Sequence, residues 1–299
     1  GAGGATHVVA DGALLNGNMT LAGGAMQLGS VQILGDFVHS GGSLATGAAD
    51  TVTVNAGASL SFASGAGIGG SGTFVNDGTI NLNGFSTTMA KLTGFGTVNN
   101  NGTAPSTLTI NASDSFTFNG SITDGTSGRG GVSLTKTGNG ILTLNSADSN
   151  YSGVTTINGG GIRVLQLGFG GQNSGIGSAS NAAANLVFNG GSLRFFNNVS
   201  TFTDRSFTLG LGDSAGAIIA DGTVIGAIVA FGFDGLSPAV AFTGSGSRTL
   251  TLGGANRGDN LFNLVLGDGT GGPTSLNKIG NGTWVLGVTN TYKGETMVN

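Results

Sequence analysis

Short runs in which apolar residues alternate with small polar ones recur along the whole chain. Examples are TVTVN at 51–55, SLSF at 59–62, TLTI at 107–110 and ILTL at 141–144. A period of two predicts β-strands with one buried and one exposed face. The runs end at Gly, Asn or Asp, residue types that suit tight corners. The pattern therefore predicts an all-β protein made of many short strands.

Helices do not fit this pattern. The chain holds 61 glycines among its 299 residues, and each glycine inside a helix costs about 1 kcal/mol. The best helical candidate is SASNAAANL at 178–186, where a single helical turn is a minor alternative.

Two architectures can use such strands: an antiparallel sandwich or barrel, and a β-solenoid. Hairpin proteins usually show longer strands with stronger alternation. A corner after every few residues favours a solenoid, in which each coil has three short strands and stacks on the coil below. At about 20 residues per coil, we expect roughly 13 to 15 coils. With about 4.8 Å per coil, the rod would be about 60 to 70 Å long.

Composition narrows the range of partners. The net charge is −4, and the 10 basic residues are scattered, whereas a nucleic-acid-binding face needs clustered Lys and Arg. Cysteine is absent, which excludes disulfides and thiolate metal sites. No apolar run is long enough for a transmembrane helix. The chain starts at Gly1, so we expect a removed signal peptide or a fragment.

One phrase occurs twice, as LTKTGNGILTL at 134–144 and as LNKIGNGTWVL at 276–286. The equivalent positions are Lys136 and Lys278, Gly138 and Gly280, Asn139 and Asn281, Gly140 and Gly282, Tyr151 and Tyr292, and Gly153 and Gly294. Duplication indicates structural roles. We expect the lysines on an outer face with their stems packed flat, the tyrosines covering a loop, and the GNG glycines at a corner.

The two copies resemble the passenger-associated repeat of autotransporter proteins. Between them, ANLVFNGGSLRFF at 184–196 and TDRSFTLG at 203–210 resemble that family's spacer. The resemblance implies a right-handed parallel β-helix that is secreted or displayed on a bacterial surface. It divides a single elongated solenoid, 1–299, into generic coils (1–104), a first passenger-type repeat block (105–165), spacer coils (166–274) and the truncated start of a second repeat (275–299).

Catalytic and metal-binding chemistry finds little support. Polysaccharide-cleaving β-helices need converging carboxylates, but Glu295 is the one glutamate, and Asp124 and Asp268 lie in the turn phrases DGTSG and DGTGG. His7 and His39 lack metal-ligand spacing. GGANRGDNL at 253–261 is only faintly similar to a calcium-binding repeat. We therefore predict no catalytic, cofactor-binding or metal-binding residues. The adhesive tripeptide Arg257–Gly258–Asp259 and an ice-binding threonine array are minor alternatives.

The favoured function is that of an extracellular structural scaffold, at a bacterial surface or in a fibre. One alternative is an adhesin that binds host or glycan surfaces through loops such as 166–185 and 253–272. A polysaccharide-processing enzyme is the weakest alternative. Neither terminal segment shows a capping device, so we expect end-to-end self-association or continuation in a longer chain. We also expect equal burial for Leu142 and Trp284, and for Leu144 and Leu286.

Overall fold

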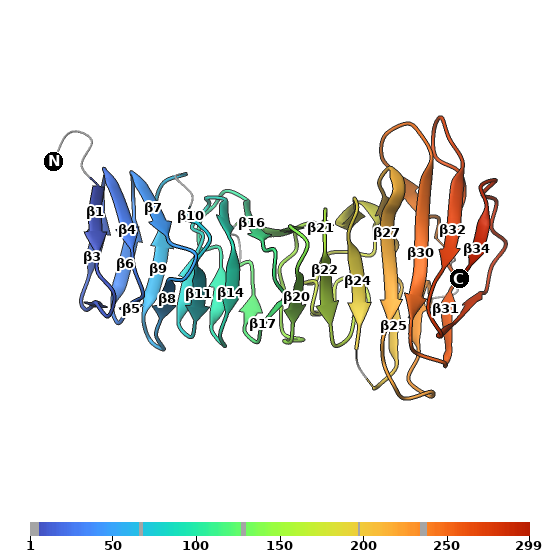
Figure 1. Cartoon of the computed structure of the whole chain (residues 1–299), viewed down its shortest axis with the longest axis horizontal. Coiled ribbons are helices and arrows are strands. Elements are labelled where there is room, and N and C mark those ends of the chain that lie inside the picture. The colour runs from blue at the N-terminus through green and yellow to red at the C-terminus, as the bar shows by residue number, and fades with distance from the viewer. Residues whose placement is uncertain (1–5, 66–67, 127–129, 197, 234–237) are drawn as a thin grey trace.

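The protein is a straight rod of stacked coils (Figure 1). The computed structural model describes residues 6–65, 68–126, 130–196, 198–233 and 238–299. Every strand pair in this part of the chain is parallel, and the one antiparallel contact is an isolated bridge between Gly269 and Gly272. The predicted parallel β-solenoid is therefore confirmed, and the hairpin alternative is wrong.

Three faces run along the rod, and each is built from two sheets. The first face begins with a four-stranded sheet of β1 (Thr6–Val9), β4 (Ala25–Leu28), β7 (Ser43–Thr46) and β10 (Ile68–Gly70). It continues as a seven-stranded sheet of β13 (Thr87–Met89), β16 (Ser106–Asn111), β19 (Val132–Thr137), β21 (Thr155–Ile157), β23 (Leu186–Phe188), β26 (Thr208–Leu209) and β29 (Ala241–Phe242).

The second face begins with a five-stranded sheet of β2 (Leu14–Leu15), β5 (Val31–Ile33), β8 (Thr51–Val54), β11 (Thr73–Asn76) and β14 (Lys91–Thr93). It continues as an eight-stranded sheet of β17 (Phe116–Phe118), β20 (Ile141–Leu144), β22 (Gly161–Val164), β24 (Ser192–Phe195), β27 (Gly212–Ala220), β30 (Arg248–Gly254), β32 (Thr274–Lys278) and β34 (Thr296–Val298). A parallel bridge between Gly94 and Phe118 joins the two sheets.

The third face begins with a six-stranded sheet of β3 (Met19–Leu21), β6 (Asp36–His39), β9 (Ser59–Phe62), β12 (Thr79–Asn81), β15 (Thr97–Asn99) and β18 (Ser121–Ile122). It resumes as a four-stranded sheet of β25 (Thr201–Thr203), β28 (Val229–Phe231), β31 (Asp259–Phe262) and β33 (Thr283–Leu286). Between β18 and β25 this face consists of loops.

The second face gives the number of coils. Within the residues that the structure describes, the chain crosses this face thirteen times, in the five-stranded and the eight-stranded sheet together, which is at the lower end of the predicted range. Coil length varies. Ala25 pairs with Ser43, eighteen residues later, whereas Thr208 pairs with Ala241, thirty-three residues later. The longer coils carry projecting loops, which widen the C-terminal end of the rod (Figure 1). Segment 178–186 contains one 3-10 turn, η1 (Ala183–Asn185).

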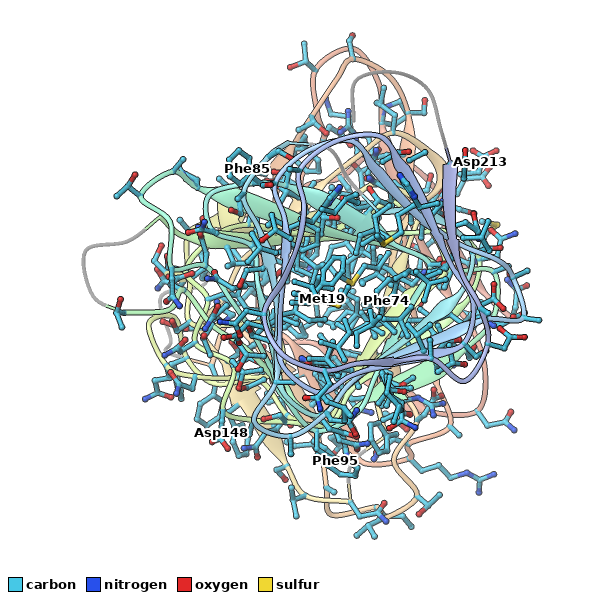
Figure 2. The ribbon with its side chains drawn as sticks, turned by 90° about the vertical axis from the view of Figure 1, so that its left-hand side faces the viewer. Met19, Phe74, Phe85, Phe95, Asp148 and Asp213 are labelled. Carbon is cyan, nitrogen blue, oxygen red and sulfur yellow. The ribbon has the colours of Figure 1, made fainter. Side chains whose placement is uncertain are left out.

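A single apolar core fills the rod from end to end. Because side chains alternate along each strand, every second residue points inward and stacks on its counterpart in the next coil. In the view along the axis, Met19 and Phe74 lie inside the coil, while Phe95, Asp148 and Asp213 lie outside it (Figure 2). Each buried aliphatic or phenylalanine side chain contributes about 1.5–3 kcal/mol, so the column of inward residues holds the coils in register.

The second repeat lies one face further around the rod than the first. Strands β19 and β20 belong to the first and second faces, whereas β32 and β33 belong to the second and third. The expected equality of burial is wrong for both pairs, most clearly for Leu144, which is 2% exposed, and Leu286, which is 39% exposed. Strand β20 lies between two neighbours, but β33 pairs with β31 alone. Leu142 is buried, and Trp284 is partly buried against the core.

Candidate functional site

The repeat lysine lies inside the rod, not on its outer face. In β19, Val132, Leu134 and Lys136 all face the core, and Lys136 is fully buried between Ile110 and Ile157 of the adjacent strands. The expectation of an outer position is wrong for Lys136, because the inward alternation of the strand continues through it. Burial lowers the pKa of its ammonium group to about 8.

Both repeat lysines bond the carbonyl oxygens of the corner that follows them. Lys136 Nζ donates to the carbonyl oxygens of Thr137 (2.5 Å) and Gly138 (3.0 Å). Lys278 Nζ donates in the same way to Ile279 (3.0 Å) and Gly280 (2.6 Å). Lys278 is half-buried. Buried carbonyl groups need donors, so the lysine stabilises the corner from within.

The GNG sequence is the corner itself. Gly138 and Gly280 have φ values of +72° and +71°, a conformation that side chains other than glycine rarely adopt. The last glycine allows the coils to approach closely. A Cβ atom on Gly140 would lie 2.0 Å from the carbonyl oxygen of Asp114 in the previous coil. The asparagines between the glycines, Asn139 and Asn281, are exposed.

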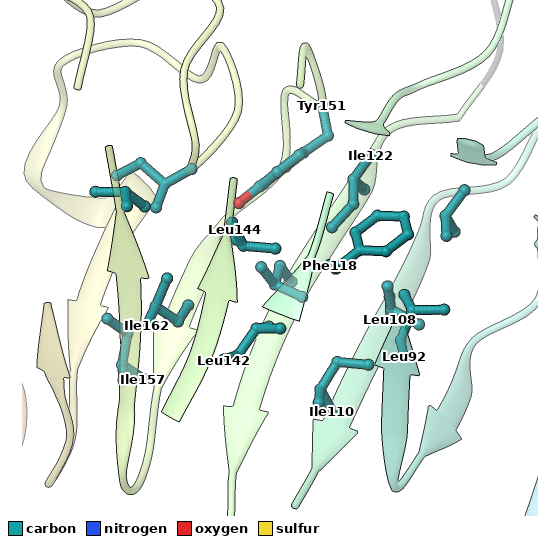
Figure 3. Packing of buried hydrophobic residues seen from close by; sticks show 14 of the residues in the cluster. Leu92, Leu108, Ile110, Phe118, Ile122, Leu142, Leu144, Tyr151, Ile157 and Ile162 are labelled. Atoms are coloured by element: carbon teal, nitrogen blue, oxygen red, sulfur yellow. The ribbon is translucent and has the colours of Figure 1, made fainter. Parts of the chain in front are cut away.

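The repeat tyrosine is a core residue. Tyr151 is fully buried, although we expected it to cover a loop, and its ring points into the core near Leu144 (Figure 3). It occupies the part of the third face that has no strand. Its hydroxyl group lies 2.8 Å from that of Thr155. Burial raises the pKa of the Tyr151 hydroxyl group well above its usual range.

The second copy repeats this arrangement in a more exposed setting. The hydroxyl groups of Tyr292 and Thr296 lie 2.7 Å apart. The glycine after each tyrosine lets the loop cross close to the preceding repeat strand. Gly153 N donates to Val132 O (3.0 Å), and Gly294 N donates to Thr274 O (2.9 Å).

An aspartate upstream of each copy completes the unit. Asp124 Oδ1 accepts from the backbone N–H groups of Val132 (2.7 Å) and Ser152 (3.1 Å). Asp268 Oδ1 accepts likewise from Thr274 (2.8 Å) and Lys293 (3.0 Å). These bonds hold the pKa of the Asp268 carboxyl group below its usual value. Sequence reasoning treated both aspartates as ordinary turn residues, although the shared phrases DGTSG and DGTGG pointed to this equivalence.

Two buried arginines in the spacer bond the carbonyl oxygens of loops, just as the repeat lysines bond the carbonyl oxygens of corners. Arg205 is 2% exposed, and its guanidinium group donates to the carbonyl oxygens of Gly168, Phe169, Gln172, Gly177 and Ala179. Arg248 is 1% exposed and donates to those of Leu209, Gly210, Thr243, Gly244 and Gly246. Burial lowers the pKa of both side chains. Sequence reasoning missed both roles.

The structure keeps the two histidines apart. His7 is exposed on β1, whereas His39 is fully buried on β6 with its ring centroid 6.0 Å from that of Phe62. In the parts of the chain that the structure describes, no group of three His, Cys, Asp or Glu side chains could hold a metal ion. No helix there is long and apolar enough to span a bilayer.

The stretch at 253–261 forms a corner and the start of a strand. Arg257 and Asp259 are exposed, but Gly258 is buried. A Cβ atom on Gly258 would lie 2.2 Å from the carbonyl oxygen of Ile225. Asn256 and Asn260 direct their amide groups to backbone carbonyl oxygens of this corner and of the adjacent coils.

Comparison with known proteins agrees with this geometry. The passenger-associated-transport-repeat family matches residues 134–164 and 276–299, the two segments that carry the repeat lysine, the GNG corner and the tyrosine. The chain is also 36% identical over 269 residues to the adhesin BmaC autotransporter of Brucella suis biovar 1 (strain 1330). This match covers 87% of the chain but 7% of the relative. No solved structure matches the chain significantly. The chain is therefore a β-helix that carries two segments similar to the passenger-associated transport repeat, and most of its length is similar to a small part of an autotransporter adhesin.

Proposed function

We propose that this chain is a rigid β-helical segment of a surface-displayed passenger and that it presents adhesive surface away from the bacterial cell. The observation that carries the proposal is the burial of three charged side chains, one in the first repeat and two between the repeats. Lys136, Arg205 and Arg248 are buried and bonded to backbone carbonyl oxygens. These groups hold corners and loops in place and are inaccessible to substrate.

A non-enzymatic role fits the positions of the carboxylates. Asp124 and Asp268 bond to backbone N–H groups, and Asp114 and Asp221 form ion pairs with Lys91 and Arg194, each at 2.7 Å. Hydrolysis of a glycosidic bond needs two carboxyl groups facing one substrate. The described carboxylates that make these contacts serve turns and ion pairs instead.

Adhesion is supported by the loops and by the relative. Arg205 holds the loop between β22 and β23 in a fixed shape through its five carbonyl partners. A fixed loop loses little conformational entropy when it binds. The relative's name assigns adhesion to that protein, and we propose the same role and an extracellular location for this chain.

Strands β33 and β34 also offer a surface with which further coils, or a second copy of the chain, can pair. Leu286 and Val298 are 39% and 76% exposed on β33 and β34. Each of these strands pairs on one side only. Unpaired strand edges with exposed apolar residues pair readily with other strands.

Surface display tests the proposal. A non-adherent bacterium carrying the 299-residue chain on its surface should bind to host cells or to immobilised glycans, and should release no sugar from the glycans it binds. The variant Arg205→Lys, with a mobile loop, should adhere less. Release of oligosaccharide products would show that the chain is an enzyme and would overturn the proposed scaffold function. If the folded, displayed rod does not adhere, the proposal that this chain presents an adhesive surface is wrong.

A further inference from the structure

Two arginines lie opposite one another on the outer face of the eight-stranded sheet. Arg163 on β22 pairs in register with Arg194 on β24, strands that lie side by side in Figure 1. Neighbouring strands are about 4.8 Å apart. Like charges in directly opposed positions destabilise a sheet. This arrangement therefore does not serve stability, and a negatively charged ligand would relieve it.

Each arginine is held in place on one side. The guanidinium carbon of Arg163 lies 5.2 Å from the centroid of the Phe196 ring. Arg194 Nη2 lies 2.7 Å from Asp221 Oδ2. The Asp221 carboxylate thus pairs with one of the two positive charges. Among the described residues the Arg163 guanidinium group has no hydrogen-bond acceptor. The Nε atoms of both arginines are buried and lack an acceptor there.

A groove of about 260 Å³ on the same face reaches Arg194, one strand away from Arg163. Its lining includes Ser192, Arg194, Ser214, Ala217 and Thr251. Ser192, Ala217 and Thr251 are register partners on three consecutive strands, so the groove runs along the rod axis. Its floor consists of small side chains, some of which carry hydroxyl groups.

Two isoleucines give the groove an apolar side. Ile219 and Ile279 both line it. A Cβ atom placed on Gly253 would lie 2.9 Å from Ile219 and 2.6 Å from Ile279, so the two side chains approach each other over that glycine. A sugar ring offers the matching surfaces, with hydroxyl groups for Ser192 and Thr251 and an apolar face for the isoleucines.

We propose that this surface binds an acidic saccharide, whose carboxylate or sulfate group lies between Arg163 and Arg194 while its sugar rings follow the groove. Planar guanidinium groups bind such anions through two parallel hydrogen bonds. Nucleic acid is a poorer candidate, because the chain has a net charge of −4 and its other basic residues do not extend the site. The source of the saccharide, a host surface or another bacterium, rests on the proposed adhesive function, but the binding itself does not.

Calorimetric titration of the 299-residue chain tests this site. The probes are a tetrasaccharide of galacturonic acid, its neutral methyl ester, a sulfated tetrasaccharide and inorganic phosphate. At least one acidic tetrasaccharide should bind with a stoichiometry of one, and the one that binds identifies the acid group. Arg163→Gln and Arg194→Gln should each weaken binding by about tenfold or more, the loss expected for a charged hydrogen bond. Asp221→Asn should strengthen it, because the competing carboxylate is removed.

Lys91→Gln is the matched control, because Lys91 forms the same kind of ion pair with Asp114 elsewhere on the rod. It should bind as the unmodified chain does. The site is refuted if neither acidic tetrasaccharide binds, if the methyl ester binds equally well, or if Lys91→Gln weakens binding as much as the arginine variants. Phosphate binding at the same concentration would show a simple anion site and refute the saccharide. If Arg194→Gln fails to fold, Arg163→Gln and Asp221→Asn still decide the question. If the displayed chain does not adhere to cells but an acidic tetrasaccharide still binds, the proposed adhesive function is wrong and this binding site stands.

Discussion

Tyr151 and Thr155 share a hydrogen bond of 2.8 Å between their hydroxyl groups, inside a core that excludes water. The tyrosine takes the place of an inward strand residue on a face where the coil has only a loop. The threonine opens the next strand, β21. The bond therefore connects the irregular part of the coil to the regular part. Tyr292 and Thr296 form the same bond at 2.7 Å, which makes it a property of the repeat.

Replacing Tyr151 with Phe should lower the free energy of unfolding by about 1–2 kcal/mol, because the Thr155 hydroxyl group loses its short buried partner. Thr155 retains only a 3.4 Å contact with the carbonyl oxygen of Ile176. Tyr292→Phe is the matched control and should have a smaller effect, because water can reach that pair. Urea unfolding midpoints measure both changes. An equal or larger effect at Tyr292 would contradict the role assigned to burial.

Lys136→Met should destabilise the rod at pH 7 by about 1–3 kcal/mol, since it leaves two corner carbonyl groups without their donor. Lys278→Met should have a smaller effect, because Lys278 is half-buried. Methionine preserves the apolar stem, so the loss reports the ammonium group. Chemical denaturation of the two variants in parallel measures the difference. A Lys136→Met rod as stable as the unmodified protein would show that the corner needs no donor.

The same residue gives a pH dependence with a definite sign. Burial lowers the pKa of Lys136 from 10.5 to about 8. Between these values the unfolded chain binds more protons at this group than the folded chain does, so stability rises with pH. The unmodified protein should therefore gain stability relative to Lys136→Met between pH 8 and about pH 10.5. A difference between the two proteins that stays constant, or that shrinks, over this range would contradict the assignment.

The sequence predicted the strands and corners of the repeat well, because both depend on local rules. Period-two alternation located β20, and glycine at positive φ located the corner at Gly138. The same alternation, extended from Val132 through Leu134 to Lys136, would also have placed the lysine inside. We expected it outside because charge normally favours the surface. The pattern was correct, and the general preference for exposed charge was the wrong guide at this position.

Long-range contacts explain what the sequence did not reveal. Arg205 reaches carbonyl groups 26 to 37 residues earlier in the chain. Asp124 bonds to Ser152, 28 residues later. Such partners depend on how the loops of one coil fold over the next coil. No spacing in the sequence specifies this folding. The shift of the second repeat by one face has the same origin, because it depends on coil lengths that the loops of the spacer determine.

His39 should make the N-terminal coils sensitive to acid. Burial lowers its pKa, and the backbone of Gly42, which acts in the opposite direction, offsets this only in part. Its neighbours in the core are apolar: Leu21 and Phe62 are its register partners. The nearest charged residue on its strand is Asp36, which is exposed and bonded to Ser59. Among the described residues, neither ring nitrogen makes a hydrogen bond of good geometry.

A lowered pKa in the folded state means that the neutral ring is favoured. The stability contributed by His39 is present above its unfolded pKa of 6.5 and is lost as the pH falls below that value. The protection factors of the amide groups in β3, β6 and β9, which correct for the intrinsic pH dependence of exchange, should therefore fall as the pH drops below 6.5, and His39→Leu should remove the effect. His7→Asn, at an exposed site, is the control and should behave like the unmodified protein. Acid-sensitive exchange that persists in His39→Leu would assign the effect to another group.

Arg205→Lys should release the loop between β22 and β23 while leaving the rod intact. A lysine keeps the positive charge but cannot reproduce the planar fork that reaches five carbonyl groups at once. The loop should become cleavable by a protease of broad specificity at Gly168–Ala179, a segment that Arg205 holds in the unmodified chain. The free energy of unfolding should fall by about 3 kcal/mol, as expected when a buried charged network loses its centre.

The matched change is Arg248→Lys, because both Nη atoms of Arg248 donate to carbonyl oxygens of the loop between β29 and β30. Limited proteolysis followed by mass spectrometry should locate the new cleavage sites near Thr243–Gly246 in that variant and near Gly168–Ala179 in Arg205→Lys. Each arginine contacts its own loop, so each variant should expose that loop alone. Cleavage at both loops in both variants would instead indicate general unfolding of the spacer. Full resistance in Arg205→Lys would show that coil stacking fixes the loop without the guanidinium group.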